Sequence, residues 1–185
     1  MERRRRISSP VLSIDGAEVE VRVAESDDAQ AIQDLWRDML AEDIWFIETL
    51  EEHVTEVNRF RTELMKLLAQ PHCNVWCAEL RGYVVGVVRL LGGQMARTRH
   101  VASLDIFLAE DVRGQALGRR LMEVLIAYAQ RDRILHRLEL SVFVDNEAAV
   151  RLYESLGFEH EGTRKHAIRE SDGRFRDALN MVLWV

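Results

Sequence analysis

The sequence is poor in cysteine and proline, with only two of each among 185 residues. Cys73 and Cys77 fall in a segment that reads as a β-strand, in which four residues span about 13 Å. That separation is too large for a disulfide between them. Their spacing also differs from that of zinc-binding cysteine pairs, and the six histidines show no metal-ligand spacing. We therefore expect two reduced thiols, no metal site and a cytoplasmic location.

The sequence also lacks an excess of positive charge and any long apolar run. Its formal net charge of -6 argues against nucleic acid as a partner. No apolar stretch approaches the roughly 20 residues that span a bilayer, and none follows the first arginines as in a signal peptide, so we expect no membrane association. The composition, 48% hydrophobic and 30% charged, is typical of one folded domain. We expect a flexible basic tail over residues 1–10 and one domain over residues 11–185.

Hydrophobic periodicity and turn residues divide the chain into strands and helices. Asp15-Gly16 marks a first turn, Ser26 is the expected cap of the first helix, and Gly157 ends a short helix. The expected strands cover residues 11–24, 74–80, 83–91, 101–109, 138–144, 158–168 and 174–184. Four helices are expected: two that begin near residues 26 and 116, and two that cover residues 50–68 and 146–156. The strand–helix–strand unit around 104–144 implies one parallel pair, so the fold class is α/β (α+β): a mixed, mostly antiparallel sheet with helices on both faces.

One glycine-containing loop predicts an anion-binding site. The segment 113–120, RGQALGRR, follows an expected strand and opens an expected helix. Amides at a helix start lack intrahelical partners, and the helix dipole favours an anion there. We therefore interpret the loop as a seat for a pyrophosphate, with a helix cap carrying surface arginines as the alternative. The residues expected to bind the cofactor here are Arg113, Gly114, Gln115, Ala116, Leu117, Gly118 and Arg119.

Two motifs together resemble those of the GCN5-related N-acetyltransferase (GNAT) family. The first is Arg113-x-x-Ala116-x-Gly118, in which Ala116 replaces a glycine of the family and is expected to be helical. The second is Asn146-x-x-Ala149-x-x-Leu152-Tyr153-x-x-x-Gly157-Phe158. The resemblance implies transfer of an acetyl group from acetyl-CoA to an amine, and residues 138–162 are similar to bacterial L-amino-acid N-acetyltransferases. It also implies a splayed parallel strand pair and a homodimer.

The same resemblance assigns roles around the thioester. Tyr153 aligns with the general acid of the family; a free phenol has a pKa of about 10 and is protonated at neutral pH. The backbone of Ile106, Phe107 and Leu108 would pair with the pantetheine arm, and the amide of Asn146 would touch that arm or the acid. Packing of Tyr153 and N-capping by Asn146 are the alternative interpretations.

The acceptor side is less determined by the sequence. Asp105 is the first candidate for the base that deprotonates the amine, and Glu110 is the second. Trp45 and Phe46 lie where family members line the acceptor pocket, although they could equally be core residues under a loop. Arg164 and Asp177, on facing strands, could bind a charged acceptor or form a cross-strand ion pair.

Three functions remain open on the sequence alone. The first is acetylation of a small-molecule amine, possibly a free amino acid, at a closed pocket. The second is acetylation of a protein N-terminus or lysine, which requires an open acceptor groove. The third is an acyl-CoA-binding module without catalysis, which would not need Tyr153.

Overall fold

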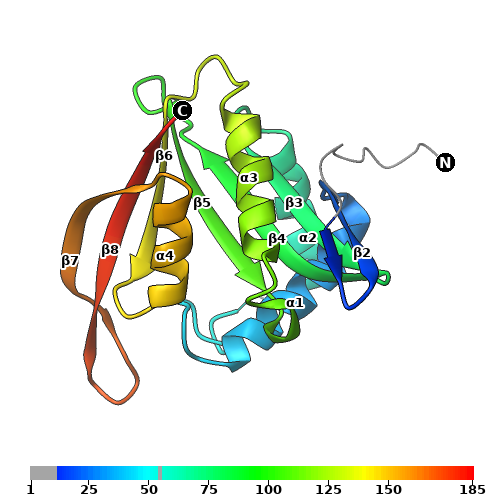
Figure 1. Ribbon diagram of the computed structural model, residues 1–185, viewed down its shortest axis with the longest axis horizontal. Coiled ribbons are helices and arrows are strands. Elements are labelled where there is room, and N and C mark those ends of the chain that lie inside the picture. Colours follow the sequence, from blue (N-terminus) through cyan, green and yellow to red (C-terminus); the bar gives the residue numbers. More distant parts are fainter. Residues whose placement is uncertain (1–11, 54–55) are drawn as a thin grey trace.

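The computed structural model describes residues 12–53 and 56–185 and forms one eight-stranded sheet with helices on both faces (Figure 1). The expected basic tail and Val11 lie outside the described residues. The elements, in chain order, are β1 (Leu12–Ile14), β2 (Ala17–Val23), η1 (Ser26–Asp28), α1 (Ala29–Ala41), α2 (Val57–Leu68), β3 (Asn74–Leu80), β4 (Tyr83–Gly92), β5 (Val101–Leu108), η2 (Glu110–Val112), α3 (Leu117–Ala129), β6 (Arg137–Phe143), α4 (Glu147–Ser155), β7 (Glu159–Arg169) and β8 (Phe175–Trp184).

Strand order is β1-β2-β3-β4-β5-β6-β8-β7, and within residues 12–53 and 56–185 only β5 and β6 pair in parallel. The mixed, mostly antiparallel sheet expected from the sequence is therefore confirmed. The strand β8 lies between β6 and β7, so the last hairpin adds its final strand to the sheet interior and leaves β7 at the edge. Such an order requires the chain to leave β6, pass through α4 over the position of β8 to the edge strand β7, and return as β8.

Alternating side chains of the strands divide the core into two layers. Trp76, on β3, packs with the cluster that includes α3 and α4, whereas its neighbours Val75 and Cys77 pack with α1 and α2. The same alternation on β5 sends Leu104 to the first cluster and Phe107 to the second. Period-two alternation of this kind is what a strand covered on both faces requires.

The parallel pair is short, and this decides where a site can form. β5 and β6 pair only from Val101–Ser103 to Arg137–Glu139, although both strands continue well beyond that point. The structure thus confirms the splayed pair that the resemblance implied. Past Ser103 the two strands diverge, and the backbone edge of β5 that faces β6 has no partner strand among the described residues.

Two expectations about helix starts were wrong. Ser26 lies inside the 3₁₀ turn η1, whose cap is Glu25. The amide of Glu25 donates to Asp28 Oδ2 at 2.7 Å, so Asp28 rather than Ser26 supplies the capping carboxylate. The helix expected over 50–68 begins only at Val57, because the amides of Glu52 and His53 both donate to the carbonyl of Thr49, closing a turn instead.

The remaining features of the described residues agree with an ordinary folded domain. Cys73 and Cys77 are both free and buried, and burial raises the pKa of the Cys77 thiol to about 12. No helix in residues 12–53 and 56–185 is long and apolar enough to cross a membrane. In the same residues, no group of three or more His, Cys, Asp or Glu side chains is arranged to hold a metal ion.

Candidate active site

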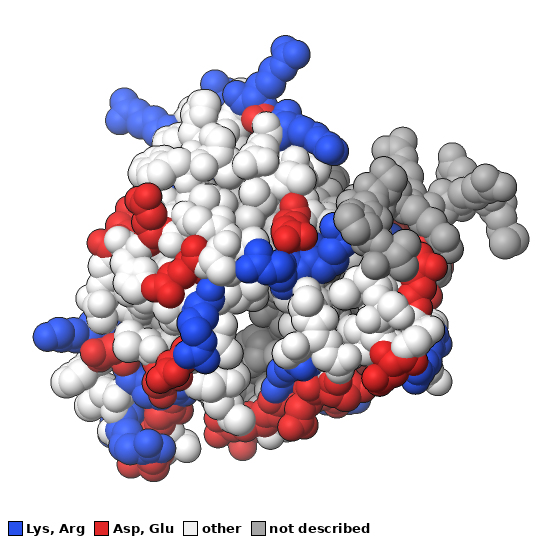
Figure 2. Space-filling model, viewed as in Figure 1, with Lys and Arg blue, Asp and Glu red and all other residues white. Residues whose placement is uncertain are grey.

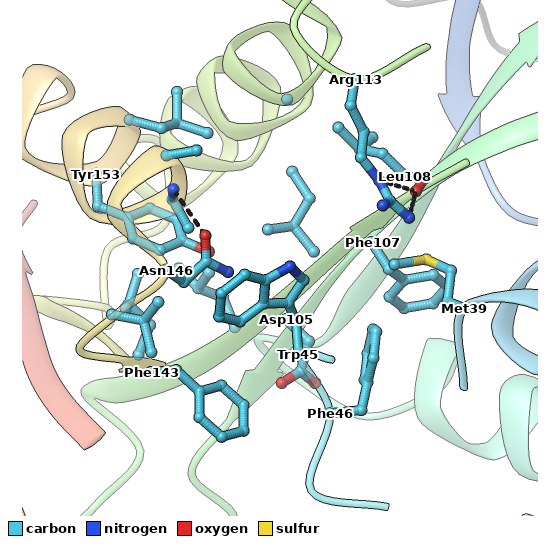
Figure 3. A pocket seen from close by; sticks show the side chains of 18 of the residues that line it. Met39, Trp45, Phe46, Asp105, Phe107, Leu108, Arg113, Phe143, Asn146 and Tyr153 are labelled. Carbon is cyan, nitrogen blue, oxygen red and sulfur yellow. Dashed lines mark hydrogen bonds between the residues drawn. The ribbon is translucent and has the colours of Figure 1, made fainter. Parts of the chain in front are cut away.

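A cavity of about 730 Å³ occupies the opening between the diverging strands β5 and β6. It is bordered by the loop before α3, by α4, and by residues 43–53 between α1 and α2, which we call the roof loop. Figure 3 shows the labelled side chains of Trp45, Asp105, Asn146 and Tyr153 around this opening. The residues expected from the sequence that line it are Trp45, Phe46, Asp105, Ile106, Phe107, Leu108, Arg113, Gly114, Ala116, Gly118, Arg119, Asn146 and Tyr153.

Two expected cofactor residues do not line the cavity with the others. The side chain of Leu117 is fully buried in the core. Gln115 turns back along its own loop, and its Nε2 donates to the carbonyl of Asp111 at 2.8 Å. These two residues could therefore bind a cofactor only through their backbone amides.

The loop before α3 is built from left-handed backbone. Gly114 has a φ of 75° and Ala116, the cap of α3, has a φ of 63°. The expected helical conformation of Ala116 is therefore wrong. Closely spaced left-handed residues turn successive N–H groups toward one side and create an anion-binding concavity. Outside the helix itself, the amides of residues 114–119 donate to no backbone acceptor in the described part of the chain.

The Arg113 side chain connects two elements of the structure. Its Nη1 and Nη2 donate to the two carboxylate oxygens of Glu42 at 2.7 and 2.6 Å, and its Nε and Nη2 also donate to the carbonyl of Leu108. The hydrogen bond to Glu42 raises the pKa of the guanidinium further. The side chain therefore ties the end of β5 to the end of α1, just before the roof loop.

Positive charge near the loop comes from the start of α3. Arg119 lines the cavity and donates to Ser155 Oγ at 2.6 Å. Figure 2 shows Lys and Arg side chains bordering a hollow on the face that carries α3 and α4.

Gly118 is tightly enclosed, because a Cβ there would lie 3.3 Å from both Leu108 and Leu152. A glycine at this position thus lets α3 approach β5 and α4 closely.

Tyr153 lies on α4 and is 7% exposed. Burial raises the pKa of its phenol, and the carboxylate of Asp105 raises it further. Its ring packs beside Phe158 with a centroid distance of 5.8 Å. Asn146 caps α4, since its Oδ1 accepts a hydrogen bond from the amide of Ala149 at 3.2 Å. The cap interpretation of Asn146 is confirmed, and its side chain also lines the cavity.

On the other side of the slot, Asp105 shares the β5 face of Phe107. Its Oδ2 accepts a hydrogen bond from Arg89 Nη2 at 2.6 Å, and the Arg89 guanidinium lies 4.4 Å from the ring centroid of Trp36. Glu110 does not line this cavity. The arrangement puts a carboxylate, a guanidinium and an indole together in the lining of the cavity.

The roof loop closes that end with aromatic side chains. Trp45 lies 6.1 Å from Phe143 of β6, and Phe46 lies 6.5 Å from Phe107 of β5, measured between ring centroids. Arg164 and Asp177 do not line the cavity. They do not form the expected ion pair either: the register pairs Arg164 with Ala178, and Asp177 Oδ1 accepts from the amide of His166 at 2.8 Å.

Sequence reasoning missed several residues of this site. Four of them line the cavity from three elements: Trp36 and Met39 from α1, Arg89 from β4 and Phe143 from β6. One signal was available for Arg89, because it is a lone charge within the apolar strand Tyr83–Gly92. The others occupy ordinary apolar positions, and only the tertiary arrangement turns them toward the slot.

Comparison with known proteins agrees with this geometry. The sequence profile of the Acetyltransferase (GNAT) family matches residues 30–158. The chain is 30% identical to the L-amino acid N-acetyltransferase AaaT of Escherichia coli K12, over 90% of this chain and 98% of that protein.

Two solved structures share the fold. An acetyltransferase of the GNAT family from Streptococcus pneumoniae superposes with a TM-score of 0.87 and 28% identity, covering 91% of this chain and all of that one. The structure of yncA, a putative acetyltransferase from Salmonella typhimurium with its cofactor acetyl-CoA, has a TM-score of 0.77 and 22% identity, covering 90% and 93%. The chain belongs to the GNAT family and is an N-acetyltransferase that uses acetyl-CoA and an amine acceptor.

Proposed function

We propose that this N-acetyltransferase acetylates the primary amine of a small molecule, with free amino acids as the first candidates, and that Tyr153 is its general acid. The observation that carries this proposal is the joining of an amide-lined loop, a buried phenol and a roofed aromatic pocket in one cavity. The similarity to an L-amino acid N-acetyltransferase over nearly the whole chain supports the choice of acceptor.

The donor half of the cavity fits a nucleotide thioester. Acetyl-CoA supplies an acetyl group activated as a thioester, carried on a pyrophosphate and an amide-bearing arm. The amides of residues 114–119 would hold the pyrophosphate, and Arg119 would add charge there. The free edge of β5 at Ile106 and Phe107 would hydrogen-bond the arm as an added strand does. The carbonyl of Leu108 already accepts from Arg113, so Leu108 contributes less to this pairing.

Tyr153 would keep its proton until the sulfur departs. A raised pKa holds the phenol neutral throughout the physiological range. A cysteine-like thiolate has a pKa of about 8.5 in water, and desolvation in the same slot raises it toward that of the phenol. Proton donation by a positioned side chain typically contributes about 10²–10⁴-fold to the rate.

Asp105 would accept the proton of the acceptor amine, directly or through water. One of its oxygens is held by Arg89, and its side chain remains 47% exposed. The charge of Asp105 acts on Tyr153, so the base on β5 and the acid on α4 would flank the reacting carbon. This division of labour is the one that an amine attack on a thioester requires.

The pocket beyond the acetyl group suits a compact acceptor. The roof loop covers it with Trp45 and Phe46, which disfavours a protein N-terminus or lysine that needs an open groove. Aromatic walls would hold an apolar side chain of the acceptor. A binding module without catalysis would have no use for a phenol buried at the donor's reactive end.

Two further features are proposed with the function. A cytoplasmic location fits the two free thiols, since oxidising compartments convert thiols to disulfides. A homodimer fits the edge strand β7, most of whose residues are exposed and which pairs only with β8 in the described structure. Sedimentation of the purified protein would measure the assembly.

The test is thiol release from acetyl-CoA with a panel of amines: the free L-amino acids, polyamines, and peptides with free N-termini. We expect turnover with at least one amino acid, and no turnover with any free amine would refute the proposal. Tyr153→Phe should lower kcat by about 10²–10⁴-fold with nearly unchanged affinity for acetyl-CoA. An unchanged kcat would remove Tyr153 from the acid role.

A further inference from the structure

Arg176 of β8 is joined to the roof loop by contacts that its neighbours on the strand do not make. Its Nη1 donates to the carbonyl of Ile44 at 2.7 Å, a residue 132 positions away in sequence. Its guanidinium lies 4.9 Å from the ring centroid of Trp45 and 4.0 Å from that of Phe143. One side chain therefore contacts both the roof and the β6 wall of the acceptor pocket.

The Arg176 guanidinium also donates hydrogen bonds to two carboxylates outside the roof loop. Nη2 donates to Asp145 Oδ1 at 2.7 Å, at the turn between β6 and α4. Nη1 donates to Glu170 Oε1 at 3.1 Å, just beyond the end of β7. Asp145 directly precedes Asn146, the cap of the helix that carries Tyr153. The position of Arg176 is thus fixed by the β6–β8 half of the molecule.

The roof loop, in contrast, begins on the β5 half. Glu42, next to its first residue, is bound bidentately by Arg113, which also holds the end of β5. Phe46 packs toward Phe107 of β5. The loop therefore crosses the splay, with one attachment on each side, and the contact with Arg176 is the attachment on the far side.

This far attachment is incompletely satisfied. Arg176 Nε is buried and has no hydrogen-bond partner in the described structure. A buried donor without a partner weakens the closed arrangement. A contact of this kind holds a loop in place and still allows it to be released.

We propose that Arg176 is a positioning residue that holds the roof loop closed over the acceptor pocket, through the Ile44 carbonyl and the Trp45 and Phe143 rings. The proposal deepens the proposed function and rests on it. An acceptor enters when the Arg176–Ile44 bond opens, and reclosure orients the amine and excludes water. Acetyl-CoA binding is independent of this contact, because the amides of residues 114–119 lie at the other end of the cavity.

The test compares Arg176→Ala with Arg174→Ala. Arg174 is equally charged, lies two residues away, is 78% exposed and forms its ion pair with Asp172, so it is a matched control. With the best acceptor of the amine panel, we expect Arg176→Ala to raise the acceptor KM about tenfold and to change the KM for acetyl-CoA by less than about twofold. Arg174→Ala should change neither constant.

A second readout follows the roof loop without turnover. Acrylamide quenching of Trp45 is obtained as the difference between each protein and its Trp45→Phe counterpart. We expect the quenching constant of Trp45 to rise about twofold in Arg176→Ala. Arg176→Lys keeps the charge and a donor but loses the planar stacking group. Its Trp45 quenching constant should therefore lie between those of the unsubstituted protein and Arg176→Ala.

Equal acceptor KM and equal Trp45 quenching in Arg176→Ala and Arg174→Ala would overturn the proposal. If Arg176→Ala does not fold, the same two measurements on Arg176→Lys decide it, and values equal to those of the unsubstituted protein reject it. If no amine is acetylated, the proposed function fails, whereas the quenching experiment still tests the attachment of the roof loop.

Discussion

The buried arginine on β2 and the two arginines beside the cleft differ in how fully their guanidinium groups are hydrogen-bonded. Arg22, on β2, is 2% exposed, and all three of its guanidinium nitrogens donate hydrogen bonds, to Asp28, Glu79 and the carbonyl of Val23. At the cleft, Arg89 and Arg176 each keep a buried Nε without a partner in the described structure. A saturated buried network specifies a fold, whereas an unsaturated one leaves donors and freedom for ligands.

Two other buried side-chain atoms without a hydrogen-bond partner also lie near the cleft. Trp36 Nε1 and His53 Nε2 are buried without partners among the described residues, and the ring centroids of Trp36 on α1 and His53 in the roof loop lie 5.5 Å apart. Ala116 holds a left-handed backbone at the expected phosphate seat. Strain of this kind persists at sites because the surrounding structure enforces it.

The largest effect on stability is expected at the saturated network. Asp28→Asn keeps the size of the side chain but removes the charge that faces the buried Arg22. Breaking one member of a buried ion pair destabilises a protein by about 3–5 kcal/mol. Urea denaturation would measure the loss.

Asp145→Asn is the matched substitution at the cleft. Asp145 is 64% exposed beside Arg176, and exposed pairs contribute about 1 kcal/mol or less. Equal losses in Asp28→Asn and Asp145→Asn would contradict the distinction between the two networks.

For Arg89 we expect a small effect on stability and a large effect on activity. Among the described residues its side chain hydrogen-bonds Asp105 alone, so Arg89→Met should change the free energy of unfolding by less than about 1 kcal/mol. The same substitution releases Asp105 and empties one wall of the acceptor pocket, so kcat/KM for the acceptor should fall about 10–100-fold. A large loss of stability with an unchanged kcat/KM would assign Arg89 to the scaffold.

The pH dependence tests the acid across the slot. Burial, and secondly the charge of Asp105, raise the pKa of Tyr153, so its phenol stays protonated at alkaline pH. The rate profile should therefore show no alkaline fall from this group below about pH 10. Asp105→Asn removes one of the two causes and should move any alkaline limb of kcat to lower pH. A fall centred near neutrality in the unsubstituted enzyme would show that Tyr153 is not the acid.

The smallest effect is expected at the strained loop. Ala116→Gly removes the left-handed penalty of about 1–2 kcal/mol and adds an unfolded-state entropy cost of about 0.5–1 kcal/mol, for a net gain of about 0.5 kcal/mol. Gly114→Ala is the matched change in the opposite direction: its Cβ would meet no neighbour within 4 Å, so only the φ of 75° opposes it. Thermal unfolding should rise slightly in the first variant and fall in the second.

Much of the fold could be read from the sequence because its signals are local. Alternation and turn residues predicted every strand from β3 to β8 to within about one residue at each end. The start of α2 could not be predicted in this way, since apolar spacing does not reveal that Thr49 and Glu52 close a turn. The cap of the first helix depended in turn on Asp28, which Arg22 holds from a neighbouring strand.

The sequence by itself determined the family, because two motifs with fixed spacing carry it, and the order of elements, because alternation and turn residues are local signals. The role of the loop before α3 in binding the cofactor stays a prediction. The resemblance pointed to Trp45 and Phe46 at the acceptor end, but only the tertiary structure decided which side chains surround them. Trp45, Arg89, Phe143 and Arg176 come from the roof loop and from three strands, and no periodicity links them. They meet because β5 and β6 separate after three paired residues on each strand, and the roof loop then crosses the opening.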